Sequence, residues 1–281
     1  MADTARRVTR IIAGQATSDG AGVRLYRVIG GQALPELDPF LLLDEFVSDD
    51  PDDYIAGFPE HPHRGFETVT YMLAGRMRHG DNLGNSGLLE AGSVQWMTAG
   101  RGILHSEMPE QEDGLMWGFQ LWVNLPARNK LRAPRYQDIP PADIPGLTLA
   151  GARLRVIAGA WGEVQGPVQD IDAAPVYLDL ELDPGAILAV PLPRGHAAFV
   201  YCFGGELAIG DGGAATLLER RRLAVLGDGD SVRLAAGTAG ARALVVAGQP
   251  FGEPIARYGP FVMNTREEIM TAIEDLRSGR F

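Results

Sequence analysis

Two short stretches of the chain carry most of the side chains that could bind a metal ion. Residues 61–67 read HPHRGFE, and residues 102–110 read GILHSEMPE. Side chains alternate between the two faces of a strand, so His61 and His63 should point the same way, as should His105 and Glu107. Imidazole and carboxylate groups together suit Fe, Mn, Ni, Cu or Zn, and the lack of thiolates disfavours a closed structural zinc site. Four protein ligands on an octahedral ion would leave two positions for substrate, water or dioxygen.

Glu67 is a second candidate for the carboxylate ligand. It shares its parity with His61 and His63 and could reach inward from the same strand. Spacing alone therefore leaves both Glu67 and Glu107 open. His79, in RHGD beside a turn, is expected at the surface.

Composition favours β structure and argues against nucleic-acid binding. The chain has 281 residues, which suggests two domains or one unusually large one. Its 36 glycines and 19 prolines indicate many tight turns rather than long helices. A formal net charge of -11, without a local basic patch, would repel phosphate backbones, so no direct nucleic-acid partner is expected.

The single cysteine and the lack of a long apolar run predict a cytoplasmic location. Cys202 cannot form an intramolecular disulfide, and its setting in VYCF suggests a small buried residue. The first residues, MADTARRVTRIIAG, lack the apolar core of a signal peptide, and no run of eighteen apolar residues occurs. We therefore expect no membrane partner.

The elements that would position the candidate ligands are strands. Short apolar runs such as ETVTYMLAG, SVQWMTAG, FQLWVNLP and VYLDLEL recur between turn signals, which predicts an all-β sandwich or barrel. Near the end, Thr265 and Glu268 have the spacing of a capping box, followed by apolar residues at helical intervals and by Gly279. One C-terminal helix is predicted. The proline-rich stretch ARNKLRAPRYQDIPPADIPG reads as a connector between two halves.

The two halves repeat one strand-turn unit. When the sequence is aligned with itself at a shift of 130 positions, HPHRGFETVTYMLAG matches PLPRGHAAFVYCFGG. Arg64 is then aligned with Arg194, and Gly65 with Gly195. The second copy lacks the candidate ligands: Pro191 and Pro193 stand where the first copy has its two histidines. We therefore expect one metal ion per chain, bound in the first half. His196 is expected to be a structural or surface histidine.

With these motifs in view, the sequence resembles the pirin family of the cupin superfamily. The likeness rests on HPHRGFETVTY, WMTAGRGILHSEMP, QLWVNLP and GEPIARYGPFVMNT, and runs from about residue 20 to the predicted helix. The resemblance implies two antiparallel, jelly-roll type cupin β-barrels face to face, finished by a C-terminal helix. Residues 1–135 would form the metal-binding barrel, and residues 145–281 the barrel without ligands, including the helix.

The resemblance also implies which residues bind the metal. In pirins a single mononuclear iron is held at the positions occupied here by His61, His63, His105 and Glu107. The position of Glu67, a ligand in many other cupins, is not used.

Three functions are compatible with such a site. The resemblance implies a quercetin 2,3-dioxygenase-like enzyme, in which a flavonol binds as its anion, dioxygen opens the central ring, and Glu107 accepts the hydroxyl proton as well as coordinating. The alternative is a non-enzymatic regulator whose iron redox state controls binding of a protein partner. A cupin isomerase is the third. Four apolar or aromatic side chains could line the pocket or belong to the barrel core: Phe66, Trp96, Met97 and Met108.

Overall fold

The computed structural model describes residues 4–281, and within them strands predominate and the only α-helix is the C-terminal one, α1 (Arg266–Arg277). The all-β prediction is confirmed. Two compact units make up these residues. The first unit comprises residues 16–31, 39–141 and 251–281, and the second comprises residues up to 15, 32–38 and 142–250.

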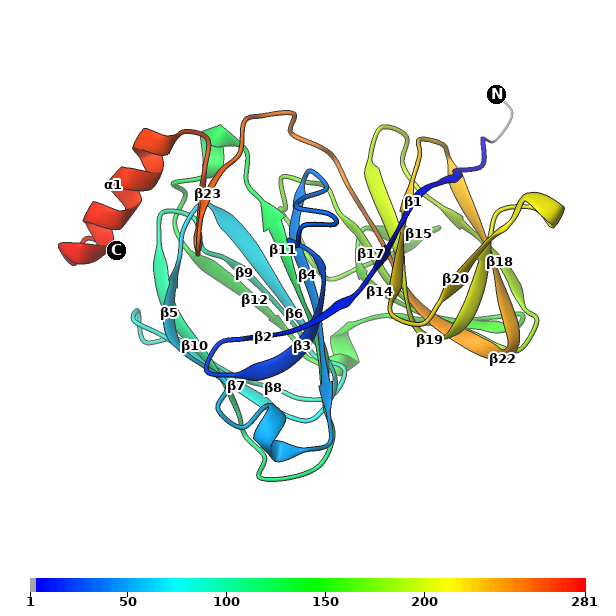
Figure 1. Cartoon of the computed structure of the whole chain (residues 1–281), viewed down its shortest axis with the longest axis horizontal. Coiled ribbons are helices and arrows are strands. Elements are labelled where there is room, and N and C mark those ends of the chain that lie inside the picture. Colours follow the sequence, from blue (N-terminus) through cyan, green and yellow to red (C-terminus); the bar gives the residue numbers. More distant parts are fainter. Residues whose placement is uncertain (1–3) are drawn as a thin grey trace. The chain divides into compact units, whose positions relative to one another are not determined.

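The unit boundaries differ from the expected ones at both ends of the chain. Strand β1 (Val8–Ala13) pairs with β21 (Arg222–Leu226), so the first strand of the chain belongs to the second unit. Helix α1 belongs to the first unit instead of the second. Figure 1 shows this exchange: the blue β1 runs beside yellow strands, and the red helix accompanies the cyan and green strands. The boundaries were missed because pairing across more than 200 positions leaves no local signal in the sequence.

The first unit contains two antiparallel sheets. The seven-stranded sheet has the order β12-β9-β6-β11-β4-β3-β2, and the four-stranded sheet has the order β5-β10-β7-β8. A short hairpin, β23-β24, precedes the helix. The bounds are β2 (Gln15–Asp19), β3 (Val23–Ile29), β4 (Phe40–Ser48), β5 (Phe58–His63), β6 (Phe66–Ala74), β7 (Met77–Asp81), β8 (Ser86–Leu89), β9 (Val94–Thr98), β10 (Ile103–Pro109), β11 (Met116–Asn124), β12 (Arg135–Ile139), β23 (Ala256–Tyr258) and β24 (Phe261–Met263).

The second unit is built on one nine-stranded antiparallel sheet with the main order β1-β21-β19-β22-β17-β14-β13, to which β18 and β20 add. Leucine, valine and alanine side chains from these strands fill its interior as one apolar cluster, which includes the buried Cys202. The bounds are β13 (Gly146–Leu149), β14 (Ala152–Ala158), β15 (Ala160–Trp161), β16 (Val164–Gln165), β17 (Val176–Leu182), β18 (Ile187–Pro191), β19 (Ala197–Ile209), β20 (Thr216–Glu219) and β22 (Ser231–Gly248).

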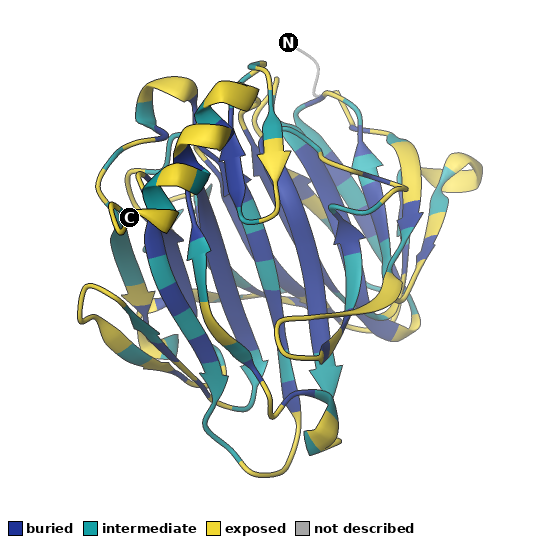
Figure 2. Cartoon of the chain, turned by 60° about the vertical axis from the view of Figure 1, so that its left-hand side comes forward, coloured by how far each residue is buried: buried dark blue, intermediate teal, exposed yellow. Residues whose placement is uncertain are grey.

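The C-terminal helix begins with the predicted capping box. The Thr265 hydroxyl accepts from the Glu268 amide at 3.2 Å, and the Glu268 carboxylate accepts from the Thr265 amide at 2.9 Å. Ile269 and Ala272 are buried with Phe261 of β24, whereas the outer face of the helix is exposed (Figure 2). No α-helix among residues 4–281 has the length and hydropathy of a membrane span.

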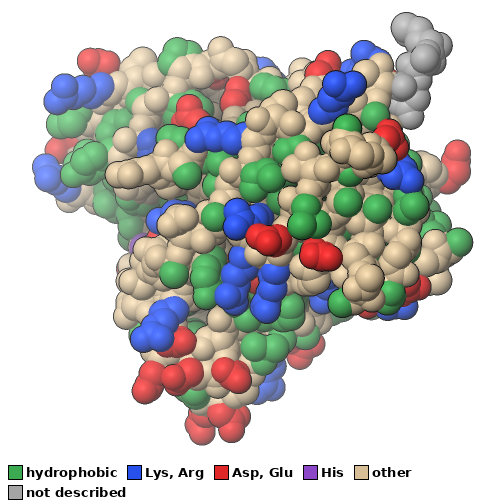
Figure 3. All heavy atoms as spheres, turned by 45° about the vertical axis from the view of Figure 1, so that its right-hand side comes forward, with side chains coloured by type: hydrophobic (Ala, Val, Ile, Leu, Met, Phe, Trp, Pro, Cys, Tyr) green, Lys and Arg blue, Asp and Glu red, His purple; other side chains and the backbone are tan. Residues whose placement is uncertain are grey.

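Several charged side chains on the surface of the second unit form ion pairs. Arg153 lies 2.5 Å from Glu181, and Arg194 lies 2.5 Å from Asp230. On the face drawn in Figure 3, basic and acidic side chains lie next to one another. Exposed pairs of this kind contribute about 0 to 1 kcal/mol each, so the buried strand faces account for most of the stability.

Candidate metal centre

Three of the predicted ligands meet in the first unit. β5 and β10 are antiparallel neighbours, and His105 is paired with His61 in their register. One ring nitrogen from each of His61, His63 and His105 lies within 4.8 Å of the others. The ring centroids are 4.5 Å apart for His61 and His105 and 4.9 Å apart for His63 and His105. The two strands therefore bring together histidines that are about forty positions apart in the sequence.

β5 can carry the motif HPH because it is an edge strand. It pairs only with β10 in the four-stranded sheet, so Pro62 removes no hydrogen bond from a central strand. His61 and His63 then lie two positions apart on the same face, as the alternation predicts. His63 and His105 are 2% and 1% exposed, whereas His61 is half-buried and borders a cavity.

The turn that follows β5 is held by residues from the C-terminal part of the first unit. Gly65 has φ +90°, and a Cβ there would lie 2.0 Å from the Val262 carbonyl oxygen. The buried Lys130 ammonium donates to the Gly65 and Val262 carbonyl oxygens at 2.8 and 3.0 Å. Arg64 donates to Asp275 of α1 at 2.8 Å. These contacts fix the end of β5 and hence the direction of His63.

Two of the histidines, His63 and His105, are in the protonation state that a metal ion requires. Burial, and then the neighbouring histidines, hold the pKa values of His63 and His105 well below their ordinary range, so both rings are neutral at pH 7. His61 Nδ1 lies 2.9 Å from the Pro59 carbonyl oxygen and donates to it, and in the neutral ring this places the electron pair on Nε2. Neutral imidazole is the ligating form.

The spacing of the ring nitrogens also fits a metal ion. His61 Nε2 and His63 Nε2 are 3.0 Å apart. Two bonds of about 2.1 Å that meet at a right angle would separate their nitrogens by about 3.0 Å. Both ring nitrogens of His105 are buried and have no hydrogen-bond partner among the described residues. Such a group costs about 1 to 3 kcal/mol when left unpaired, and a cation beside it would remove that cost.

Glu107 lies in the wall of the same cavity as His61 and His63. Its side chain is 4% exposed and faces β6 and β11. Glu107 Oε1 lies 2.7 Å from the Thr70 hydroxyl, and Oε2 accepts from Gln120 Nε2 at 3.4 Å. The group of ligand atoms that lie within 4.8 Å of one another consists of the three histidines and does not include Glu107, whose carboxylate is held by Thr70 and Gln120.

Glu67 points away from this site, against the interpretation that left it open as a ligand. The chain turns at Gly65 between β5 and β6, so the alternation in β5 does not continue into β6. Thr70 of β6 contacts Glu107, and Glu67, three positions away, lies on the opposite face of the strand. There Glu67 accepts from the Thr98 hydroxyl at 2.7 Å and from Trp96 Nε1 at 3.1 Å.

We expect the buried Glu67 to make stability fall as the pH rises. Burial raises the pKa of this carboxyl group from 4.5 to about 7, against the hydrogen bonds from Thr98 and Trp96. Between these two values the folded state binds more protons than the unfolded state, so the free energy of unfolding decreases with rising pH. The decrease amounts to about 3 kcal/mol by pH 8.

Urea unfolding of the metal-free protein between pH 5 and pH 8 measures this effect. The neutral variant Glu67→Gln should lack this contribution, so its stability relative to the wild type should rise over that interval. A stability difference between the two proteins that stays constant with pH would show that Glu67 is already ionised at pH 5.

The cavity beside the histidines has a volume of about 600 Å³, and its walls come from widely separated strands. They include Leu25, Arg27, Phe46, Phe58 and Trp122. None of the four pocket candidates is among the lining residues. Phe66 and Met97 are fully buried in the core, Trp96 donates to Glu67, and Met108 packs beside Gly57.

His79 is buried, which contradicts the expected surface position. It is 1% exposed and stacks on Tyr136 with ring centroids 5.3 Å apart. Its Nε2 lies 3.2 Å from Asp138 Oδ2. The sequence context RHGD did not reveal this because both neighbours come from β12, almost sixty positions away.

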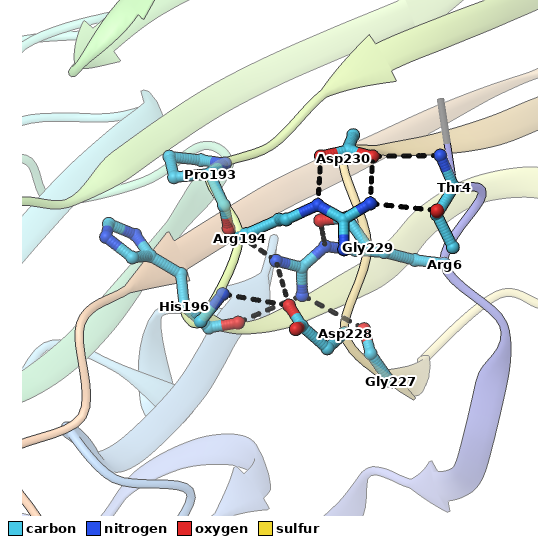
Figure 4. A network of polar contacts seen from close by, with 10 residues as sticks. Thr4, Arg6, Pro193, Arg194, His196, Gly227, Asp228, Gly229 and Asp230 are labelled. Carbon is cyan, nitrogen blue, oxygen red and sulfur yellow. Dashed lines mark hydrogen bonds and ion pairs between the residues drawn. The ribbon is translucent and has the colours of Figure 1, made fainter. Parts of the chain in front are cut away.

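In the second unit, the turn that aligns with the HPH motif is held by hydrogen bonds from Arg6. Pro191 and Pro193, which stand where the first unit has its two histidines, are exposed, and the intervening Leu192 is buried in the apolar cluster. The buried guanidinium of Arg6 donates to carbonyl oxygens around this turn, including those of Pro193 at 2.6 Å and His196 at 2.9 Å (Figure 4). The histidine cluster of the first unit is the only such group found among residues 4–281.

Comparisons with known proteins cover both units. Residues 22–123 match the family model described as Pirin, and residues 177–281 match the Pirin C-terminal cupin domain. A Pseudomonas aeruginosa protein named "Putative quercetin 2,3-dioxygenase" is 54% identical over 98% of this chain and 97% of its own length. Human pirin is 43% identical over 99% of this chain and 94% of its own. The crystal structure of a quercetin 2,3-dioxygenase from Acinetobacter baumannii superposes with a TM-score of 0.91 at 36% identity, covering 99% of both chains.

These matches run through the histidine-bearing strands, the second unit and the C-terminal helix, so they concern the whole architecture and not a single motif. They agree with a fold of two cupin domains and with the motifs that suggested it in the sequence. The chain therefore belongs to the pirin family.

Proposed function

We propose that this protein is a metal-dependent dioxygenase that opens the central ring of a flavonol such as quercetin. The observation that carries the proposal is the cluster of three histidines beside a cavity of about 600 Å³. A cavity of this size holds a small organic ligand. The names of the Pseudomonas aeruginosa and Acinetobacter baumannii relatives support the same substrate class.

We infer that one divalent ion, Fe(II), is held by His61, His63, His105 and Glu107. Mn, Ni, Cu and Zn also bind imidazole and carboxylate groups, and Cu and Zn compete strongly on affinity. Such an ion, when bound, would supply vacant positions for the flavonol and dioxygen and would lower the pKa of the flavonol 3-hydroxyl.

Glu107 is the residue that would take the proton from the flavonol 3-hydroxyl. Its carboxylate faces the cavity wall and is held by Thr70 and Gln120, which leaves little freedom of orientation. A carboxylate positioned in this way can act as a general base when the hydroxyl lies within hydrogen-bond reach.

Aromatic side chains would hold the flat rings of the substrate. Phe46, Phe58 and Trp122 line the cavity. The Trp122 ring packs against Phe66 with centroids 4.4 Å apart and against His63 with centroids 5.2 Å apart. Offset or edge contacts with such rings favour planar aromatic ligands and exclude water from the reacting oxygen atoms.

The test is a dioxygen-consumption assay with protein that carries a defined metal. The Fe(II) form should consume dioxygen and bleach the visible band of quercetin, with little turnover of an analogue that lacks the 3-hydroxyl. If the ferrous, manganous, nickel and cupric forms all fail, the dioxygenase proposal is wrong. A change in affinity for a protein partner on oxidation of bound iron would then favour the regulatory alternative.

A further inference from the structure

A charged cluster lines the same cavity as the histidines and has no part in the chemistry described above. Arg27 of β3 faces Asp44 of β4 through two parallel hydrogen bonds, Nε to Oδ1 at 2.9 Å and Nη2 to Oδ2 at 2.7 Å. Arg27 Nη2 also donates to Asp19 Oδ2 at 2.6 Å. All three residues border the cavity. The Asp44 side chain is 5% exposed and that of Arg27 is 23% exposed.

The guanidinium of Arg27 has N–H donors that make no hydrogen bond within the cluster. An arginine has five N–H groups, and the contacts with Asp44 and Asp19 use those on Nε and Nη2. Within residues 4–281, Arg27 Nη1 has no hydrogen-bond acceptor. The fork with Asp44 fixes the plane of the guanidinium, so a ligand that binds Nη1 meets a donor already in position.

Each carboxylate oxygen of Asp44 and Asp19 already accepts one hydrogen bond. Both oxygens of Asp44 accept from Arg27, and Asp19 accepts from Arg27 and from the Gly20 amide at 2.8 Å. The unused hydrogen-bonding capacity of the cluster therefore includes two N–H donors on a cation. The group that complements the two Nη1 donors is an oxygen acceptor, and hydrogen bonds from a charged guanidinium are stronger than those from a neutral donor.

We propose that Arg27 determines substrate specificity by binding, through Nη1, a carboxylate, phenolate or carbonyl oxygen at the end of the substrate remote from the histidines. The site then selects planar aromatic compounds with a metal-binding hydroxyl at one end and an oxygen acceptor at the other. The inference rests on the proposed flavonol site, because it assumes that the first end of the ligand lies at the histidines.

The experiment compares two ligands that differ only at the remote end. These are 3-hydroxyflavone and its 4′-carboxylate, whose binding to Ni(II)-loaded protein is followed anaerobically by flavonol fluorescence, so no turnover is needed. The wild type should bind the carboxylate about tenfold more tightly, the effect of one charge-assisted hydrogen bond. In Arg27→Gln/Asp44→Asn, which removes both charges together, the ratio of the two dissociation constants should fall to about one.

The same strand offers a matched control. Arg24 pairs with Asp53 at 3.0 Å, and neither residue lines the cavity. Arg24→Gln/Asp53→Asn makes the same change of residue types and should keep the tenfold ratio. Metal content and the thermal midpoint are measured for each variant. If the Arg27 double variant does not fold, a binding measurement on the wild type still tests the inference. A 4′-trimethylammonium flavonol should then bind more weakly than 3-hydroxyflavone.

Three results would overturn the inference. A ratio near one in the wild type, a tenfold ratio that persists without Arg27, or tighter binding of the cationic flavonol would each remove the role of Arg27 while leaving the proposed flavonol site intact. If neither 3-hydroxyflavone nor its carboxylate binds to the metal-loaded wild type, the proposed function falls together with this inference.

Discussion

Replacing Glu107 by glutamine is expected to lower the turnover of quercetin by at least about 100-fold, because the amide cannot accept the 3-hydroxyl proton. Glutamine preserves the size of the side chain and can still contact Thr70 and Gln120, so the cavity should keep its shape. Initial rates of dioxygen consumption, expressed per bound metal ion, separate the loss of the base from any loss of metal.

Glu110→Gln is the control for this change. Glu110 lies just beyond the end of β10 and pairs with Arg78 on the exposed surface, so its loss removes one carboxylate without altering the cavity. Its turnover should match that of the wild type. A Glu107→Gln protein with full metal content and wild-type turnover would show that another group takes the proton.

His63→Ala and His105→Ala are expected to strip the metal from the protein. Loss of a residue that merely supports a ligand already costs about 10- to 100-fold in affinity, so removal of a ligand itself should cost on the order of 100-fold or more. Both side chains are buried, and among the described residues the cluster contains no fourth histidine that could replace either of them. Metal content after gel filtration with a weak chelator measures the effect.

Two variants should keep their metal in the same experiment. Glu67→Gln changes a carboxylate on the far face of β6, and His196→Ala changes a histidine of the second unit. If Glu67→Gln empties the site while Glu107→Gln retains the ion, the carboxylate has been assigned to the wrong residue.

The face that His61 and His63 share was predictable from the sequence because it depends on local strand geometry, whereas the pairing of β5 with β10 that brings His105 to them is a long-range contact. HPH places two rings on one face of β5 whatever the rest of the chain does, and HSE does the same for His105 and Glu107 on β10. The capping box of α1 is local in the same sense. The repeat adds a further prediction: because prolines stand at 191 and 193, we expect one metal ion per chain, in the first unit.

Features that depend on breaks in a strand or on distant partners were not predictable. The parity argument for Glu67 failed because Gly65, at φ +90°, turns the chain between β5 and β6. His79 was misplaced because its partners lie on β12. The pairing of Arg27 with Asp44 joins two strands whose sequences carry no motif, so the charged wall of the cavity became visible only in the structure.

The placement of β1 in the second unit and of α1 in the first was also not predictable, because it depends on distant partners. β1 reads as a short amphipathic strand, and nothing in its residues selects β21 as its partner. The helix likewise carries a clear start signal but no signal for the unit that it joins, which is decided by the burial of Ile269 and Ala272 beside β24.

Anomalous diffraction from crystals of the iron-loaded protein, recorded at the iron absorption edge, tests the central claim most directly. We expect one peak per chain, about 2.1 Å from a ring nitrogen of each of His61, His63 and His105 and at bonding distance from a Glu107 oxygen. A peak at Glu67, a second peak in the second unit, or an iron position that excludes Glu107 would contradict the account.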